Sequence, residues 1–206
     1  MADESVRVLR EDIIADNYFP LKKVEYEQRC RDGSTQTLTR EVYDCASGAA
    51  VLLYNRERRS VLLTRQFRIG AKLSGRKSGQ EDGHDGYLLE AAAGMLDDAE
   101  PGKRARCESL EETGYVPMNM QPALQLFVSP ASTTERIHLF VAEYDGAARR
   151  GEGGGLAEEG EDIEIVEMDF DDALARVDTG EIMDAKTVLL LLHLERKVLG
   201  RHGEAS

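Results

Sequence analysis

Residues 94–115, GMLDDAEPGKRARCESLEETGY, decide how this chain is interpreted. Glu108, Glu111 and Glu112 are spaced as i, i+3 and i+4, so a helix would place them on one face. Like charges at this spacing destabilise a helix by roughly 0.2–0.5 kcal/mol per pair. A hard cation such as Mg²⁺ would reverse that cost, because it takes oxygen ligands and shares them with substrate phosphates. The spacing therefore predicts either a carboxylate helix that brings metal to a phosphorylated substrate or a solvated acidic face.

The flanking residues predict how this helix is built into the fold. A run of mostly small and apolar residues, Leu88–Ala93, leads into Gly94, and Gly114 stands where a C-cap glycine belongs. Strand, glycine turn, acidic loop and helix then form one unit. Cys107 on this helix has no base partner in view, and we interpret it as a packing residue.

This unit resembles the sequence box of the Nudix family, G-x5-E-x7-R-E-U-x-E-E-x-G-U, in which U is an apolar residue. The matching positions are Gly94, Glu100, Glu108, Glu111, Glu112, Gly114 and Tyr115. The chain departs from the box in three ways: the spacer after Glu100 is one residue short, Cys107 replaces the arginine, and Ser109 replaces an apolar residue.

The short spacer is typical of one branch, the bacterial GDP-mannose pyrophosphatases, and the chain is similar to that branch over roughly residues 7–197. The segments that carry this likeness are Asp16–Phe19, Arg40–Asp44, Leu52–Asn55, Arg65–Arg68, Ser129–Pro130, Gly153–Gly155, Glu161–Glu164 and Thr179–Ile182. Because these segments occur in the same order, the likeness is far more specific than the box alone.

The resemblance implies an α/β fold of the α+β type. It would be a Nudix α/β/α sandwich around a mixed β-sheet, preceded by an N-terminal antiparallel β-subdomain. Residues 1–46 would form that subdomain, which serves dimerisation in relatives, residues 47–198 the Nudix hydrolase domain, and residues 199–206 a tail. The sequence pattern agrees, because predicted strands outnumber predicted helices and the helices are far apart in the chain.

The apolar periodicity and the turn residues predict the individual elements. The predicted strands cover residues 21–31, 34–43, 51–54, 61–66, 88–92, 124–128, 137–144 and 163–168, and Asp32-Gly33 joins the first two as a hairpin. The predicted helices cover residues 103–113, 170–176 and 186–199. Residues 81–87 and 146–161 are polar and rich in glycine, so we expect loops, the first of them an insertion relative to the family.

Composition excludes several classes of protein. The 206 residues are 41% hydrophobic, enough for a packed core, and no apolar run approaches the ~20 residues of a membrane span. The charged N-terminus lacks the apolar segment of a secretory signal. Three cysteines without metal-binding spacing indicate reduced thiols, so we expect a cytoplasmic protein. The net charge of −13 argues against a nucleic-acid partner.

The resemblance also implies a site for Mg²⁺ or Mn²⁺. Its ligands would be Glu108, Glu112, Glu161 and the main-chain carbonyl of Ala93. Glu161 lies in an acidic loop, where Glu158 and Glu159 compete for the assignment and a solvated surface is the alternative. Glu111 would support the ligands, and Glu100 would stabilise the first turn of the helix electrostatically.

The same resemblance assigns catalysis and substrate binding. Glu112 would be catalytic, and either Glu135 or Glu161 would be the general base that activates water. Arg68 would hold the diphosphate, since guanidinium offers a planar fork to phosphate oxygens, and a solvated strand end is the alternative. The further substrate contacts would be Tyr18, Thr39, Arg40, Glu41, Ala93, Gly94, Met95, Glu135 and Lys186, the first four reaching the site of the other subunit.

The predicted function is Mg²⁺-dependent hydrolysis of a nucleoside diphosphate sugar by a homodimer, with GDP-mannose giving GMP and mannose 1-phosphate. Two alternatives stay open. One is an ADP-ribose or ADP-sugar pyrophosphatase, which would use the same chemical groups with a different base pocket. The other is a catalytically silent ligand-binding module, which the missing box arginine favours and the intact Glu108–Glu112 pair disfavours.

Overall fold

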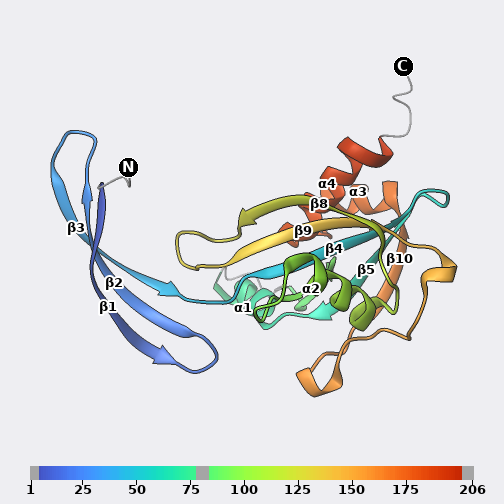
Figure 1. Ribbon diagram of the computed structural model, residues 1–206, viewed down its shortest axis with the longest axis horizontal. Helices are drawn as coiled ribbons and strands as arrows, with labels where there is room; N and C mark the ends of the chain where they lie inside the picture. Colours follow the sequence, from blue (N-terminus) through green and yellow to red (C-terminus); the bar gives the residue numbers. More distant parts are fainter. Residues whose placement is uncertain (1–4, 78–83, 201–206) are drawn as a thin grey trace. The chain divides into compact units, whose positions relative to one another are not determined.

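The computed structural model describes residues 5–77 and 84–200, so parts of the predicted 81–87 insertion and of the predicted 199–206 tail lie outside the described residues. The chain divides into two compact units (Figure 1). The first holds the chain up to Ser47 together with Leu126–Ile137, and the second holds Gly48–Gln125 and the chain from His138 onward. No helix of the described segments is long and apolar enough to cross a membrane.

The first unit is built on an antiparallel sheet in the order β1-β2-β3. Its strands are β1 (Val6–Asp16), β2 (Pro20–Arg29) and β3 (Thr35–Tyr43). The predicted hairpin between β2 and β3 is confirmed, and Gly33 adopts a φ of +85° that glycine accommodates without strain. Strand β1 was not predicted from its sequence, because its exposed apolar residues are mixed with charges and two register irregularities interrupt its alternation.

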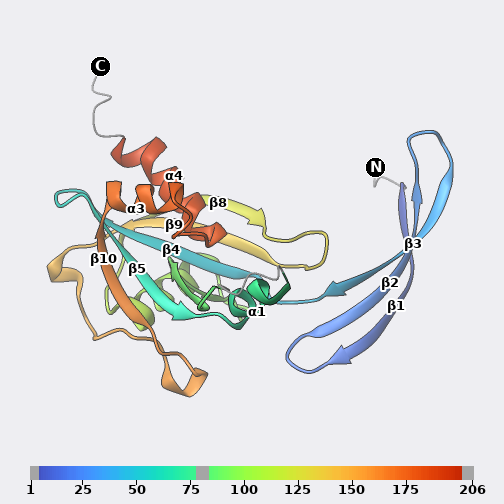
Figure 2. The same cartoon turned by 180° about the vertical axis from the view of Figure 1, so that it is seen from behind.

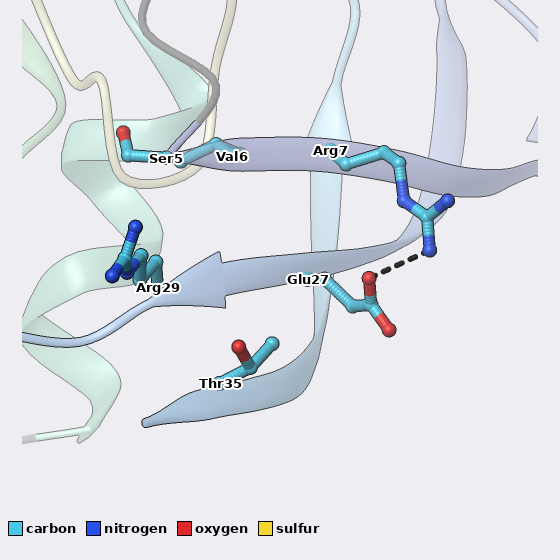
Figure 3. A pocket seen from close by; sticks show the side chains of 6 residues that line it. All are labelled: Ser5, Val6, Arg7, Glu27, Arg29 and Thr35. Atoms are coloured by element: carbon cyan, nitrogen blue, oxygen red, sulfur yellow. Dashed lines mark hydrogen bonds and ion pairs between the residues drawn. The ribbon is translucent and has the colours of Figure 1, made fainter. Parts of the chain in front are cut away.

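A hollow of about 420 Å³ lies at one end of this sheet (Figure 3). It is lined by Ser5, Val6, Arg7, Glu27, Arg29 and Thr35. An ion pair of 2.7 Å joins Arg7 Nη2 to Glu27 Oε2 across neighbouring strands. None of the first-unit residues predicted to contact the nucleotide belongs to this lining, so the hollow adds nothing to the predicted site.

The second unit contains a mixed seven-stranded sheet in the order β10-β5-β4-β9-β8, with β6 paired to β5 and β7 paired to β4. The strands are β4 (Gly48–Asn55), β5 (Ser60–Phe67), β6 (Tyr87–Glu90), β7 (Ala92–Met95), β8 (Met118–Phe127), β9 (Arg136–Glu143) and β10 (Glu164–Asp169). The predicted strand at 88–92 is thus two short strands that pair with different neighbours.

Helices cover both faces of this sheet (Figures 1 and 2). They are α1 (Ile69–Lys77), which the sequence pattern did not predict, α2 (Pro101–Glu108), α3 (Phe170–Asp178) and α4 (Ala185–Leu194). Alternate residues of β4 point to opposite faces, and every one of them is buried. Val51 and Leu53 pack in one cluster with Ala105 of α2, while α3 and α4 contact the sheet from the other side. The predicted α/β/α sandwich is confirmed.

Two predicted helices end differently from an ordinary α-helix. The box helix begins at Pro101 and closes as a π-helical turn, η1 (Ser109–Thr113). The last helix likewise continues from α4 into a second π-helical turn, η4 (Glu195–Leu199). The glycine-rich stretch at 146–161 is a loop with two short 3-10 turns, η2 (Gly146–Ala148) and η3 (Ala157–Glu159).

Candidate active site

The first turn of α2 is fixed by Glu100. Its carboxylate accepts hydrogen bonds from the backbone N–H groups of Gly102 (3.0 Å) and Lys103 (2.8 Å), and Pro101 occupies the first helical position. These donors lower the pKa of Glu100 below its usual value. The predicted structural role of Glu100 is confirmed, because its oxygens cap the helix.

Gly94 allows the helix carboxylates to approach the sheet. Strand β7 pairs with β4, with Ala93 opposite Ala50 and Gly94 opposite Ala49. A Cβ atom added to Gly94 would clash with the carboxylate of Glu108, which is only 3% exposed. The box glycine is therefore required by close approach, and it places Glu108 against the backbone just after Ala93.

Among the described residues of the box helix, Glu112 is the buried carboxylate with the fewest polar partners. Its side chain is 0% exposed, and neither carboxylate oxygen has a hydrogen-bond partner within the described residues. Burial raises the pKa of Glu112 to about 8, with a further contribution from the negative charges of Glu108 and Glu161. Burial also raises the pKa of Glu108 to about 7, against the opposing charge of Arg104. Among the described residues, the nearby positive charges do not offset the burial of these two carboxylates, so a bound cation would stabilise their charged forms.

Arg104 is the arginine that contacts the glutamates of the box helix. Its Nη2 forms an ion pair with Glu108 Oε1, and its Nη1 lies 3.9 Å from Glu111 Oε2. Cys107, at the expected arginine position, is one helical turn further along. The sequence carried a signal that was overlooked, because Arg104 and Glu108 are spaced as i and i+4.

The glycine-rich loop is hydrogen-bonded to the end of the box helix. Gly154 N–H donates to the carbonyl of Glu112 (2.8 Å), and Gly155 N–H donates to that of Glu111 (3.1 Å). The loop then brings back Glu161, whose Oε2 accepts from Leu156 N–H at 2.8 Å. The charge of Glu161 raises the pKa of both Glu108 and Glu112.

The competing glutamates of that loop are placed less favourably. Glu158 and Glu159 are both exposed on the turn η3. Glu159 raises the pKa of Glu108 but ranks behind Glu161 as a cause. This arrangement favours Glu161 among the three glutamates that the sequence left open.

Two cationic side chains, Arg68 and Lys186, contact the buried carboxylate of Glu90. Arg68, directly after β5, donates Nε and Nη2 to the two oxygens of Glu90 (2.9 and 3.0 Å), and Lys186 of α4 forms an ion pair with Glu90 Oε2. The charge of Arg68 acts on Glu112, which places the cations within electrostatic reach of the box helix. Sequence reasoning missed Glu90, although a single charge inside the run Leu88–Ala93 requires a partner.

Comparisons with known proteins point to one family. Residues 5–43 match the model of the GDP-mannose pyrophosphatase NudK N-terminal domain. A GDP-mannose pyrophosphatase of Cronobacter sakazakii is 48% identical over 191 residues, covering 93% of this chain and 95% of the relative. Those of Citrobacter koseri (95% of this chain, 98% of the relative) and Escherichia coli (93% and 96%) are each 42% identical.

The chain belongs to the GDP-mannose pyrophosphatase family. The predicted resemblance is confirmed over nearly the whole chain. In addition, the crystal structure of ADP compounds hydrolase matches with a TM-score of 0.68 over 95% of both chains, at 16% identity. At that identity the match shows the fold alone, and it agrees with the predicted fold class.

Several predicted substrate contacts of this family member belong to the first unit. They are Tyr18, Thr39, Arg40, Glu41 and Glu135. Tyr18 lies in the turn between β1 and β2, is 73% exposed, and meets the ring of Phe19 edge-on at a centroid distance of 4.8 Å. Glu135 immediately precedes β9. Their roles stay predictions.

The donor set of the second unit fits a hard divalent cation. Among the described side chains, no three histidines, cysteines or acids converge into a self-sufficient metal site. Mg²⁺ commonly uses one or two carboxylates and takes its remaining ligands from water and substrate phosphates. Buried Glu112 with two unpaired oxygens, and Glu108 against the β7 backbone, match that requirement.

Proposed function

We propose that this protein hydrolyses the diphosphate bond of GDP-mannose and releases GMP and mannose 1-phosphate. Relatives named for this activity are 42–48% identical to it over at least 93% of the chain. The observation that carries the proposal is the buried Glu112, whose two oxygens have no hydrogen-bond partner in the described part of the chain, beside Glu108 and within electrostatic reach of Arg68. Carboxylates short of positive charge next to a cation suit a metal-bound diphosphate.

Glu108, Glu112, Glu161 and the Ala93 carbonyl would hold Mg²⁺ or Mn²⁺. When bound, the cation supplies neutralising charge for the diphosphate and for the leaving phosphate. Gly94 keeps the space into which the Glu108 carboxylate projects, and Arg104 holds that carboxylate from the helix side. The ion pair between Arg104 and Glu108 supports an active enzyme over a silent module, since it gives Glu108 a guanidinium partner although Cys107 stands at the box arginine position.

Arg68 and Lys186 would bind the diphosphate, and Gly94 and Met95 would contact the substrate from β7. Glu161 or Glu135 would take the proton from the attacking water. Glu161 is the better supported of the two, because its charge acts on both buried carboxylates. Tyr18, Thr39, Arg40 and Glu41 would contact the nucleotide.

The proposal includes a homodimer that works in the cytoplasm. Strand β1 exposes large apolar side chains, with Val8 at 54% and Ile13 at 60%, and a second copy of the sheet would cover them. Contacts from Tyr18 and β3 would then be made to the site of the other subunit. The three cysteines are free thiols, as expected in a reducing compartment.

A product screen tests the function. The purified protein is incubated with GDP-mannose, ADP-ribose or ADP-glucose, with and without Mg²⁺, and nucleoside monophosphate is quantified by chromatography. We expect GMP from GDP-mannose only when Mg²⁺ is present. Preferential cleavage of an ADP compound would replace the proposed substrate, and no product from any sugar nucleotide would establish a silent module.

A further inference from the structure

Glu90 joins two cations from distant parts of the chain. Its side chain is 1% exposed at the end of β6. The guanidinium of Arg68 donates two N–H groups to the Glu90 carboxylate, and Lys186 contacts one of the same two oxygens. Burial alone would raise the pKa of Glu90, but the hydrogen bonds and charges of Arg68 and Lys186 outweigh burial and hold it below the usual value.

A second acid fixes the lysine from the helix side. Asp184 accepts from Lys186 Nζ at 2.9 Å through Oδ1, and its Oδ2 caps α4 by accepting from Thr187 N–H at 3.0 Å. The Thr187 hydroxyl donates to Asp184 (2.6 Å) and accepts from Ala91 N–H (2.7 Å). The start of α4 is thereby tied to the backbone directly after Glu90.

Arg68 and Lys186 each have N–H groups that do not contact Glu90. Of the five N–H groups of the Arg68 guanidinium, two donate to Glu90, and the others make no hydrogen bond to the residues that the structure describes. The Arg68 side chain is 43% exposed, and its charge acts on Glu112. Lys186 has a third N–H beyond those that contact Glu90 and Asp184. The unused donors therefore belong to groups beside the candidate metal site.

We propose that Glu90 is a positioning residue for a diphosphate. By binding Arg68 and Lys186 on one carboxylate, it fixes the spacing of two cations so that each meets one phosphate of the substrate. The site would then select a diphosphate over a monophosphate through Glu90, although Glu90 itself touches neither phosphate. This inference rests on the proposed function of Arg68 and Lys186.

The test compares Glu90→Gln and Glu90→Asp with the parent by calorimetric binding of GDP and GMP in Mg²⁺, and by kinetics with GDP-mannose. We expect Glu90→Gln to weaken GDP binding about ten- to a hundredfold, because two charge-assisted contacts lose their geometry. GMP binding should change little, and KM for GDP-mannose should rise more than kcat falls. Glu90→Asp keeps the charge on a shorter side chain, so its preference for GDP should lie between those of the parent and Glu90→Gln.

Glu167→Gln is the matched control, because Glu167 also sits on a strand and accepts hydrogen bonds from Ser60 and Tyr144 at 3.0 Å. It should keep the parental ratio of GDP to GMP affinity. A parental ratio in Glu90→Gln would overturn the positioning role, and if that variant does not fold, a parental ratio in Glu90→Asp would do so. If the parent binds GDP more tightly than GMP, and Glu90→Gln loses this preference, the positioning role stands. If the same parent does not hydrolyse GDP-mannose, the proposed function is refuted.

Discussion

The two sheets of this protein differ in what stabilises them. No residue between 5 and 47 is buried, although β1 carries Val6, Val8, Ile13 and Ile14 at 47–60% exposure. Every residue of β4, in contrast, is buried between helices. The described part of the smaller sheet has no buried core, so the proposed second copy would cover its apolar surface, whereas the larger unit buries its apolar residues between its own sheet and helices.

The same difference decides where the buried charges lie. Glu90, Glu108 and Glu112 are all under 4% exposed, and all three belong to the larger unit. A buried carboxylate is expensive unless it is paired, so it persists only where the surrounding packing is strong enough to hold it. The three buried carboxylates of the proposed chemistry thus lie in the well-packed unit, while the proposed subunit contacts and several of the proposed nucleotide contacts belong to the exposed sheet.

The substitution Glu112→Gln has the largest expected effect and tests whether the larger unit holds the catalytic carboxylates. It keeps the shape of the side chain and removes the charge that a divalent cation would neutralise. We expect kcat for GDP-mannose to fall by about a thousandfold, with an unchanged dimer. Steady-state kinetics in Mg²⁺ measures the effect, with Glu167→Gln as control. Parental turnover in Glu112→Gln would show that the larger unit does not carry the chemistry in this way.

Acid titration tests the cost of the buried carboxylates in the metal-free protein. The folded-state pKa values of about 7 for Glu108 and about 8 for Glu112 lie above the usual 4.5, mainly because of burial. The fold therefore holds these protons more tightly than the unfolded chain, and stability is lost as pH rises from about 5 through 8. Summed over both groups, the expected loss in free energy of unfolding between pH 5 and 8 is about 6 kcal/mol.

Chemical denaturation in EDTA at several pH values measures that loss. Mg²⁺ should restore stability at pH 8, and Glu112→Gln should flatten the pH dependence. An equally steep decline in Glu112→Gln would mean that other groups cause it.

The smaller sheet is tested by placing charges on its apolar residues. Val8→Asp combined with Ile13→Asp should weaken the dimer about fiftyfold, because two apolar side chains would no longer be buried. Analytical ultracentrifugation gives the dissociation constant. Leu192→Asp, at an exposed apolar position of the larger unit, is the control and should leave the dimer intact. Equal dissociation constants for the parent and the double variant would remove the partner role from β1.

The smallest expected effect is on the cap of the box helix. Glu100→Ala removes the acceptor for Gly102 and Lys103 N–H, so we expect the melting temperature to fall by about 3 °C. Turnover of GDP-mannose should stay close to that of the parent. Differential scanning calorimetry measures the shift, and a large loss of activity without a change in melting temperature would assign Glu100 a chemical role.

Local sequence signals predicted much of the larger unit. The glycine at 94, the cap at Glu100 and the strands around β4 and β5 each depend on near neighbours in the chain. The ion pair between Glu90 and Lys186 joins residues 96 positions apart, and no local pattern encodes it. Strand β1 escaped prediction because its apolar residues are not buried within the chain, so their alternation was weakly constrained.

The glycines at 151 and 153–155 have a practical consequence for engineering. Glycine-rich segments usually serve as flexible tethers and are favoured places for inserting tags. In this protein the backbone of these glycines packs against Gly114 and the last carbonyls of the box helix. A Cβ atom added at Gly153 would clash with the backbone of Glu112 and Thr113. The segment holds the loop against the box helix and is not a flexible linker. We expect a longer segment to move Glu161 away from Glu108 and Glu112.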